Sequence, residues 1–174
     1  MKWFLVALAV LVAVVAIVIV IGALLPKAHR ASRSAKLGQT PDALWVVITD
    51  YSKFPEWRNS VTRVEGLPAT DGKPSWREFD SHEGSIPFVV AQSAPPQRLV
   101  TCIADPNLPF GGAWTYEILP APDGGSVIRI TEDGEVYNPV FRFVSRFLIG
   151  YTGTIDTYLR ALGSKFGESI TPEP

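Results

Sequence analysis

The sequence predicts an α+β protein in which one globular domain follows a hydrophobic N-terminal helix. Three observations lead to this prediction. Residues 3–25 contain no charged or strongly polar side chain, and hydrophobic residues recur with helical spacing over 42–49 and again over 139–168. Between these two helical stretches, residues 61–136 show the alternation of β-strands, broken by turn residues. We expect one strand, two short helices, six further strands and one long helix, which is an α+β order.

The apolar segment at residues 3–25 has the length of a membrane-spanning helix. At 1.5 Å per residue it spans about 35 Å, and a bilayer core is about 30 Å thick. A cleaved secretory signal is the alternative, but its apolar region is usually about 7 to 15 residues long and ends at small residues. This run instead ends in Leu24-Leu25-Pro26-Lys27. We therefore expect residues 1–27 to be a single-pass anchor, with the lipid bilayer as a partner.

Basic residues follow the apolar segment and predict its orientation. Lys27, Arg30, Arg33 and Lys36 lie on the domain side, whereas only Lys2 and the α-amine lie on the other side. The positive-inside rule therefore favours a cytoplasmic domain. The same flank predicts a tether of about ten residues, which would keep the domain within a few tens of ångströms of the bilayer.

The composition of the domain excludes several classes of function. From residue 34 onward there are 12 Lys and Arg against 17 Asp and Glu, a formal charge of −5, so no nucleic-acid partner is expected. The lone Cys102 allows no internal disulfide, and its apolar surroundings are typical of a buried thiol. The sequence has no His/Cys cluster, phosphate-binding loop or nucleophile-elbow motif. We expect neither a metal site nor a cofactor.

The first elements of the domain are predicted from local signals. Residues 31–37 alternate weakly and indicate an edge strand. Thr40-Pro41-Asp42 starts a helix, since threonine is a good N-cap, proline suits the first helical position and an acid suits the first turn. The helix at 42–49 places Leu44, Trp45 and Ile48 on one face, and residues 52–57 indicate a second, very short helical turn.

Six strands and a C-terminal helix follow. Short turns between the strands indicate an antiparallel meander. The long helix begins after Asn138 and runs to residue 168, with Gly150 and Gly153 in its middle. Each costs about 1 kcal/mol relative to alanine, which indicates a kink or the close approach of another backbone. Residues 170–174 are expected to be a disordered tail. The predicted strands are 61–67, 75–82, 86–93, 97–104, 112–119 and 126–136.

The run Asp42-Ala43-Leu44-Trp45-Val46-Val47-Ile48-Thr49-Asp50-Tyr51, followed by Phe54-Pro55-Glu56-Trp57, resembles the START-like (SRPBCC) superfamily. Polyketide cyclase/dehydrase-type and Bet v 1-like proteins are members. With the element order, the resemblance covers nearly all of a domain at 28–169. It implies a helix-grip fold, in which a curved antiparallel sheet of about seven strands wraps around a long C-terminal helix and encloses a hydrophobic tunnel. Such proteins bind lipids, sterols, quinones or polyketides, and some catalyse cyclisation or dehydration.

Strand alternation and helical spacing predict which side chains would line this tunnel. Glu132 is distinctive because it continues the apolar face of Ile128 and Ile130. A carboxylate in an apolar cup has a raised pKa and could orient a ligand or act as an acid, whereas a solvated or Arg-paired glutamate is the alternative. For the other candidates the alternative is plain core packing. The ligand-binding candidates are Trp76, Trp114, Tyr116, Ile130, Glu132, Phe143, Phe147, Tyr151 and Ile155.

Acid–base candidates are few. Asp80 and His82 share a strand face about 7 Å apart, so the carboxylate could orient the imidazole, although His82 also suits an exposed turn. These two residues, Glu132 and Tyr116 form no evident catalytic constellation. The leading interpretation is a membrane-anchored START-like domain that binds an apolar small molecule without catalysis. The alternatives are a polyketide cyclase-like enzyme and a partner-binding or structural domain whose cavity is filled.

Overall fold

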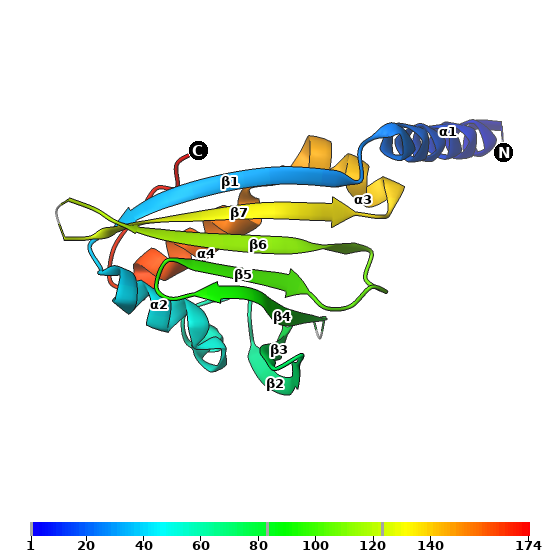
Figure 1. Ribbon diagram of the computed structural model, residues 1–174. Helices are drawn as coiled ribbons and strands as arrows, with labels where there is room; N and C mark the ends of the chain where they lie inside the picture. Colours follow the sequence, from blue (N-terminus) through cyan, green and yellow to red (C-terminus); the bar gives the residue numbers. More distant parts are fainter. Residues whose placement is uncertain (1, 83, 123) are drawn as a thin grey trace.

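The computed structural model describes residues 2–82, 84–122 and 124–174. Seven antiparallel strands form one curved sheet in the order β1-β7-β6-β5-β4-β3-β2 (Figure 1). The chain forms a meander from β2 to β7, and β1 pairs with β7 at the edge. The predicted α+β helix-grip architecture is confirmed. The strands are β1 (Ala28–Leu37), β2 (Arg63–Thr70), β3 (Lys73–Phe79), β4 (Ser85–Ala94), β5 (Arg98–Ile103), β6 (Phe110–Pro120) and β7 (Ser126–Val136).

The helices begin where the sequence signals predict. Thr40 caps α2, since its Oγ1 accepts a hydrogen bond from the Ala43 amide at 3.3 Å, and Asn138 caps α3 in the same way. The 3-10 helix η1 follows α2 after one residue. The helical elements are α1 (Lys2–Leu24), α2 (Pro41–Thr49), η1 (Tyr51–Glu56), α3 (Pro139–Val144), the π-helical turn η2 (Ser145–Ile149) and α4 (Gly153–Lys165).

The C-terminal helix is not continuous, which corrects the expectation of one helix over 139–168. It ends at Gly150, whose φ of 81° and ψ of 172° lie in a region that only glycine adopts readily, and α4 starts at Gly153. The two glycines that indicated a kink therefore produce a full break. As a result, α3 and η2 leave the axis of α4, and only α4 lies across the concave face of the sheet (Figure 1).

The hydrophobic core fills one end of the cup. Ile118 and Ile128 of the sheet, Leu44 of α2, and Leu159 and Leu162 of α4 are fully buried there. Burying each such side chain contributes about 1.5–3 kcal/mol. This core lies toward the strand ends near α2. The opposite end of the cup is left open.

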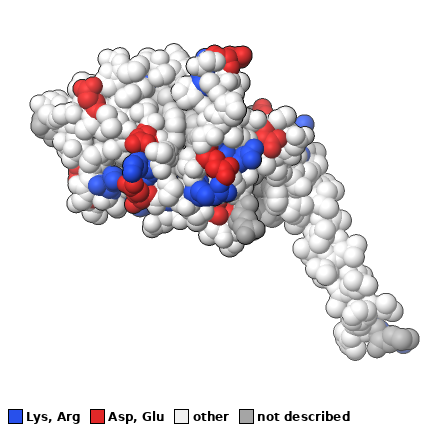
Figure 2. Space-filling view, turned by 90° about the horizontal axis from the view of Figure 1, so that it is seen from below, with Lys and Arg blue, Asp and Glu red and all other residues white. Residues whose placement is uncertain are grey.

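Helix α1 projects away from the domain (Figures 1 and 2), and its surface in Figure 2 is uncharged along nearly its whole length. It is the one helix of the described residues long and apolar enough to cross a membrane, and Gly22 is the residue of this helix that is buried. The expected tether of about ten residues is wrong. Strand β1 already begins at Ala28, because pairing with β7 continues to Ala28 opposite Glu135.

Candidate functional site

A cavity of about 650 Å³ lies between the concave face of the sheet, η1 and α4. This volume falls within the range of about 300–1,000 Å³ that is usual for small-molecule sites. One wall is a stack of rings, in which Tyr51 lies 3.7 Å from Trp76 with the planes 4° apart, and Trp76 stacks on Phe88. The aromatic side chains that line the cavity are Tyr51, Phe54, Trp76, Phe79, Phe88, Phe110, Trp114, Tyr116 and Tyr158.

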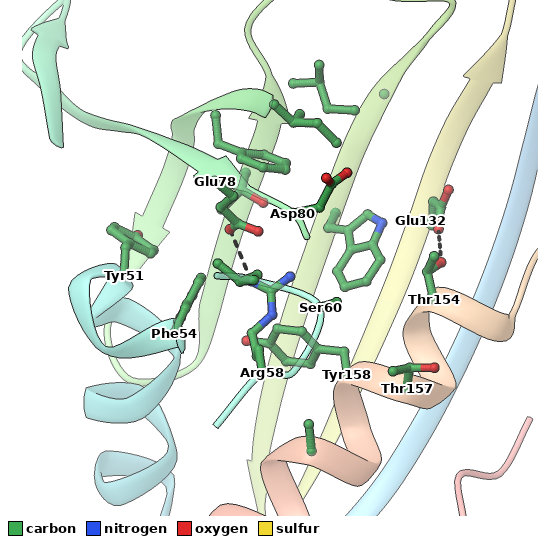
Figure 3. A pocket seen from close by; sticks show the side chains of 18 of the residues that line it. Tyr51, Phe54, Arg58, Ser60, Glu78, Asp80, Glu132, Thr154, Thr157 and Tyr158 are labelled. Carbon is green, nitrogen blue, oxygen red and sulfur yellow. Dashed lines mark hydrogen bonds and ion pairs between the residues drawn. The ribbon is translucent and has the colours of Figure 1, made fainter. Parts of the chain in front are cut away.

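An ion pair between Arg58 and Glu78 lies inside the cavity. The Arg58 guanidinium donates a hydrogen bond to Glu78 Oε1 at 3.0 Å, and their side chains are only 17% and 11% exposed. Trp76 Nε1 donates to the same oxygen at 3.0 Å. The guanidinium carbon also lies 4.6 Å from the ring centre of Phe54 and 5.1 Å from that of Tyr158 (Figure 3). The two charges neutralise each other, so this pair presents polar atoms without net charge.

Two buried tyrosines adjoin this ion pair. The ring centres of Tyr116 on β6 and Tyr158 on α4 are 5.7 Å apart. Burial raises the pKa of both phenols well above the ordinary value, and the charge of Arg58 opposes that rise only partly. Burial also raises the pKa of Tyr51 to about 12. At neutral pH these hydroxyls are therefore protonated and suit the role of hydrogen-bond donors better than that of bases.

Glu132 forms a second polar group in the cavity wall. Its Oε1 is 3.3 Å from His29 Nε2, and its Oε2 accepts a hydrogen bond from Thr154 Oγ1 at 3.5 Å (Figure 3). The imidazole of His29 stacks on the Tyr151 ring, with centroids 4.0 Å apart. The carboxylate thus has a histidine partner from the edge strand rather than the arginine weighed from the sequence. Glu132 lines the cavity, and its role there stays a prediction.

Asp80 does not orient the His82 imidazole, and His82 is the exposed turn residue expected from the sequence as the alternative. Asp80 Oδ1 instead accepts hydrogen bonds from the backbone amides of His82 at 2.7 Å and Gly84 at 3.0 Å. The carboxylate therefore closes the turn between β3 and β4, and the His82 side chain is exposed. Asp80 itself still lies at the edge of the cavity (Figure 3).

The cavity opens at the end of the sheet from which α1 leaves. The strand register places the start of β1, the end of β7 and the start of β6 side by side at this end. Lining residues at the opening include Phe110 at the start of β6, Asp80 after β3, and the exposed Thr154 and Thr157 of α4. Ile149, the last residue of η2, also lines the cavity.

The nine predicted ligand-binding residues lie in four different places. Ile130 and Ile155 are fully buried in the core, and Tyr151 stacks on His29. Phe143 and Phe147 contact each other before the helix break, outside the cavity lining. Because of that break, the predicted helix face does not continue into the cup. The predicted residues that line the cavity are Trp76, Trp114, Tyr116 and Glu132.

Three residues of the cavity were not predicted as site residues from the sequence, namely Arg58, Glu78 and Tyr158. Glu78 could have been found, because it alternates with Trp76 on the strand face proposed to look inward. Arg58 directly follows the Phe-Pro-Glu-Trp step, but no spacing signal indicates that its side chain turns inward. Among the described residues, no group of three or more His, Cys, Asp or Glu is placed to hold a metal ion.

A family model described as polyketide cyclase/dehydrase and lipid transport matches residues 28–166. The chain belongs to this family. The match covers the whole sheet and α4, so the resemblance found in the sequence is confirmed. As a member of this family, the chain is a helix-grip domain of ligand-binding type. No curated protein sequence matches it at a significant level.

Solved structures show the same fold at low sequence identity. A conserved protein from Geobacillus kaustophilus aligns with a TM-score of 0.65 and 16% identity, over 84% of this chain and 100% of that one. A START superfamily protein from Mycobacterium smegmatis gives 0.60 and 17%, over 79% and 96% of the two chains. Norcoclaurine synthase from Thalictrum flavum gives 0.61 and 12%, over 80% and 86%. These likenesses establish the fold of this family member, and its function is argued from the cavity.

Proposed function

We propose that this protein is a membrane-anchored helix-grip domain that binds an apolar small molecule with one neutral polar group. The observation that carries the proposal is the open, aromatic-lined cavity of about 650 Å³ beside the Arg58–Glu78 pair. A cavity filled by its own side chains would not leave this volume, which disfavours a purely structural domain. A lipid, quinone or polyketide-like molecule has the required chemistry.

The charge balance of the cavity limits the ligand further. Arg58 and Glu78 satisfy each other, and the Glu132 carboxylate is held by His29 and Thr154. Among the described lining residues a charged ligand would therefore meet no unpaired counter-ion of these two sites. A carbonyl or hydroxyl oxygen, by contrast, can accept a hydrogen bond from the guanidinium or from the protonated Tyr116. A neutral oxygen at one end of an apolar body is therefore the expected recognition element.

The anchor places the domain where such ligands dissolve. Helix α1 is apolar, unburied and long enough to span a bilayer, and the basic flank favours a cytoplasmic domain. Anchoring raises the concentration of the cavity close to a membrane that already holds apolar molecules. With this arrangement, an apolar ligand travels only a short distance from the bilayer to the cavity.

Mass spectrometry of organic extracts tests the proposal. The full chain, purified in a mild detergent, is expected to carry an apolar molecule. Thr157→Trp, at an exposed position of α4 that lines the cavity, should reduce its occupancy, whereas Arg160→Trp, at an exposed position of the same helix outside the lining, should not. Equal occupancy in both variants, or extracts without any such molecule, would contradict the proposal.

An enzyme of the cyclase type is the second candidate, and the placement of Glu132 favours it. This carboxylate lines the cavity, and its histidine partner could exchange a proton with it. Glu132→Gln separates the two functions, because the amide keeps an acceptor for Thr154 but cannot act as an acid. A carrier would change its affinity for the ligand at most, whereas an enzyme would lose turnover of a polyketide-like substrate.

A further inference from the structure

The end of α1 is fastened to the domain by a buried arginine. Arg142 of α3 is 6% exposed, and its Nη1 donates hydrogen bonds to the carbonyl oxygens of Leu25 at 2.8 Å and Ala23 at 3.4 Å. Its Nη2 donates to the Tyr137 carbonyl at 3.4 Å. The last carbonyls of a helix lack intrahelical donors and carry partial negative charge, so a cation is well placed there. Arg142 therefore caps the anchor helix from the domain.

A second contact brings the two backbones together. Gly22 is the buried residue of α1, and a Cβ atom at this position would overlap the Pro139 carbonyl oxygen at the start of α3. Glycine at position 22 thus allows α1 and α3 to touch directly. Together with Arg142, this contact fixes the direction in which the helix leaves the domain. The end of α1 is thus held against the domain by direct contacts.

An apolar surface continues from this junction along η2. Phe147, Leu148 and Ile149 are 56%, 73% and 70% exposed, and Phe141 of α3 is also exposed. Consecutive exposed residues of this kind are costly in water and mark an interaction surface. The exposed Arg146 directly precedes Phe147 in the chain, and the exposed Lys27 follows the end of α1, so each basic side chain adjoins an apolar segment and can reach lipid phosphates.

We infer that η2 and α1 form one membrane-contacting surface, with Phe147, Leu148 and Ile149 inserted at the boundary between headgroups and acyl chains. The inference rests on the membrane anchoring proposed above. Because Ile149 is both exposed and part of the cavity wall, this insertion holds the cavity opening against the lipid. An apolar ligand then passes from the bilayer into the cup without crossing water. The partner is the lipid surface itself, and no second protein is needed to load the site.

Depth-dependent fluorescence quenching tests this placement. The full chain carrying Cys102→Ser receives a single cysteine for a small fluorophore and is inserted into phosphatidylcholine vesicles with nitroxide groups near the top of the acyl chains. A Leu148→Cys probe should be quenched about twofold or more, as expected for a residue buried about 5–10 Å into the interface. Leu119→Cys is the matched control, since Leu119 is 62% exposed but lies at the opposite end of the sheet, and its probe should stay unquenched.

A probe at Val12→Cys, in the middle of α1, is measured in vesicles with nitroxide groups near the ends of the acyl chains and reports insertion of the anchor. Quenching at Val12 without quenching at Leu148 would overturn the inference and leave the anchor intact. A probe at Val12 that stays unquenched would overturn both the inference and the proposed anchoring. The measurement needs no ligand, so quenching at Leu148 in a protein whose extracts are empty would support the placement while refuting the proposed ligand.

The fastening of α1 makes a second, independent test possible. Gly22→Leu prevents the contact with Pro139, and Arg142→Met removes the cap on the α1 carbonyls. Both variants keep an apolar membrane segment. Each should reduce the quenching of the Leu148 probe by about half or more while leaving that of the Val12 probe unchanged, since interfacial binding depends on the apolar area buried. Unchanged quenching at Leu148 in both variants would show that the junction does not position the surface.

Discussion

Removal of Arg58 should strongly destabilise the domain, because it leaves Glu78 charged inside an apolar cavity. In the wild-type chain, Glu78 Oε1 accepts hydrogen bonds from both Arg58 and Trp76 Nε1. In Arg58→Met this oxygen keeps only the Trp76 donor. At the observed 3.0 Å, an effective dielectric constant of about 20 gives an attraction of roughly 5 kcal/mol between the two charges. Breaking a buried pair from one side costs about 3–5 kcal/mol. The stacking of the guanidinium on Phe54 and Tyr158 is lost as well.

Urea unfolding of the full chain in detergent, followed by tryptophan fluorescence, measures this effect. With a slope of about 2 kcal/mol per molar urea, the midpoint should fall by roughly 1.5–2.5 M. Arg98→Met is the matched control, since Arg98 pairs with Glu117 on a surface where both side chains are about 40% exposed, and it should cost about 1 kcal/mol or less.

The double variant isolates the charge effect. Arg58→Met combined with Glu78→Gln keeps a carbonyl acceptor for Trp76 Nε1 but removes the isolated charge. Its stability should recover to within about 2 kcal/mol of the unmodified chain, because replacing both members of a buried pair is far less costly than removing one. If Arg58→Met costs no more than the Arg98 control, the pair is solvated, and the argument for a dry cavity that selects neutral ligands is refuted.

Three other predictions follow from the same structure. Because burial raises the pKa of Tyr116 and Tyr158, only the unfolded chain loses these protons just above pH 10. The contribution of each tyrosine to stability should be constant below pH 10 and fall above it by about 1.4 kcal/mol per pH unit, and a Tyr→Phe change at either position should remove its share of the slope in urea titrations. Burial raises the pKa of Cys102, so alkylation of its thiol in the folded chain at pH 8 should be much slower than in the urea-unfolded chain; equal rates would show an exposed thiol. Gly150→Ala should lower stability by about 1–3 kcal/mol, because φ of 81° with ψ of 172° strains any residue with a Cβ, and an unchanged melting temperature would contradict the break observed there.

Most of the fold could be predicted because its signals are local. Thr40 and Asn138 are capping residues next to hydrophobic periods, and strand alternation with turn residues between the strands defined the meander. Gly150 and Gly153 indicated a kink in the C-terminal helix. Whether the helix bends or breaks depends on the φ and ψ angles of Gly150, which residue spacing does not specify. The early start of β1 was missed because its pairing with β7 is a long-range contact.

The site was less predictable than the fold, because several of its side chains are positioned by contacts that no local pattern specifies. Trp76, Trp114, Tyr116 and Glu132 were found because strand alternation assigns a side chain to one face of the sheet. Arg58 lies in an irregular segment after η1, where no period assigns a direction to its side chain. The role of Arg142 depends on a contact with carbonyls that are 117 and 119 residues away in the sequence, so no local pattern could reveal it.

Photoaffinity mapping of the full chain in a membrane tests the central claim, that an apolar molecule occupies the cavity, most directly. An apolar probe carrying one carbonyl and an alkyl diazirine should form adducts on peptides of β3, β6 and α4, at lining side chains such as Trp76, Trp114 and Tyr158. Thr157→Trp should reduce these adducts selectively. Adducts confined to the lipid-facing residues of α1 and η2, with none on the lining of the cavity, would contradict the account.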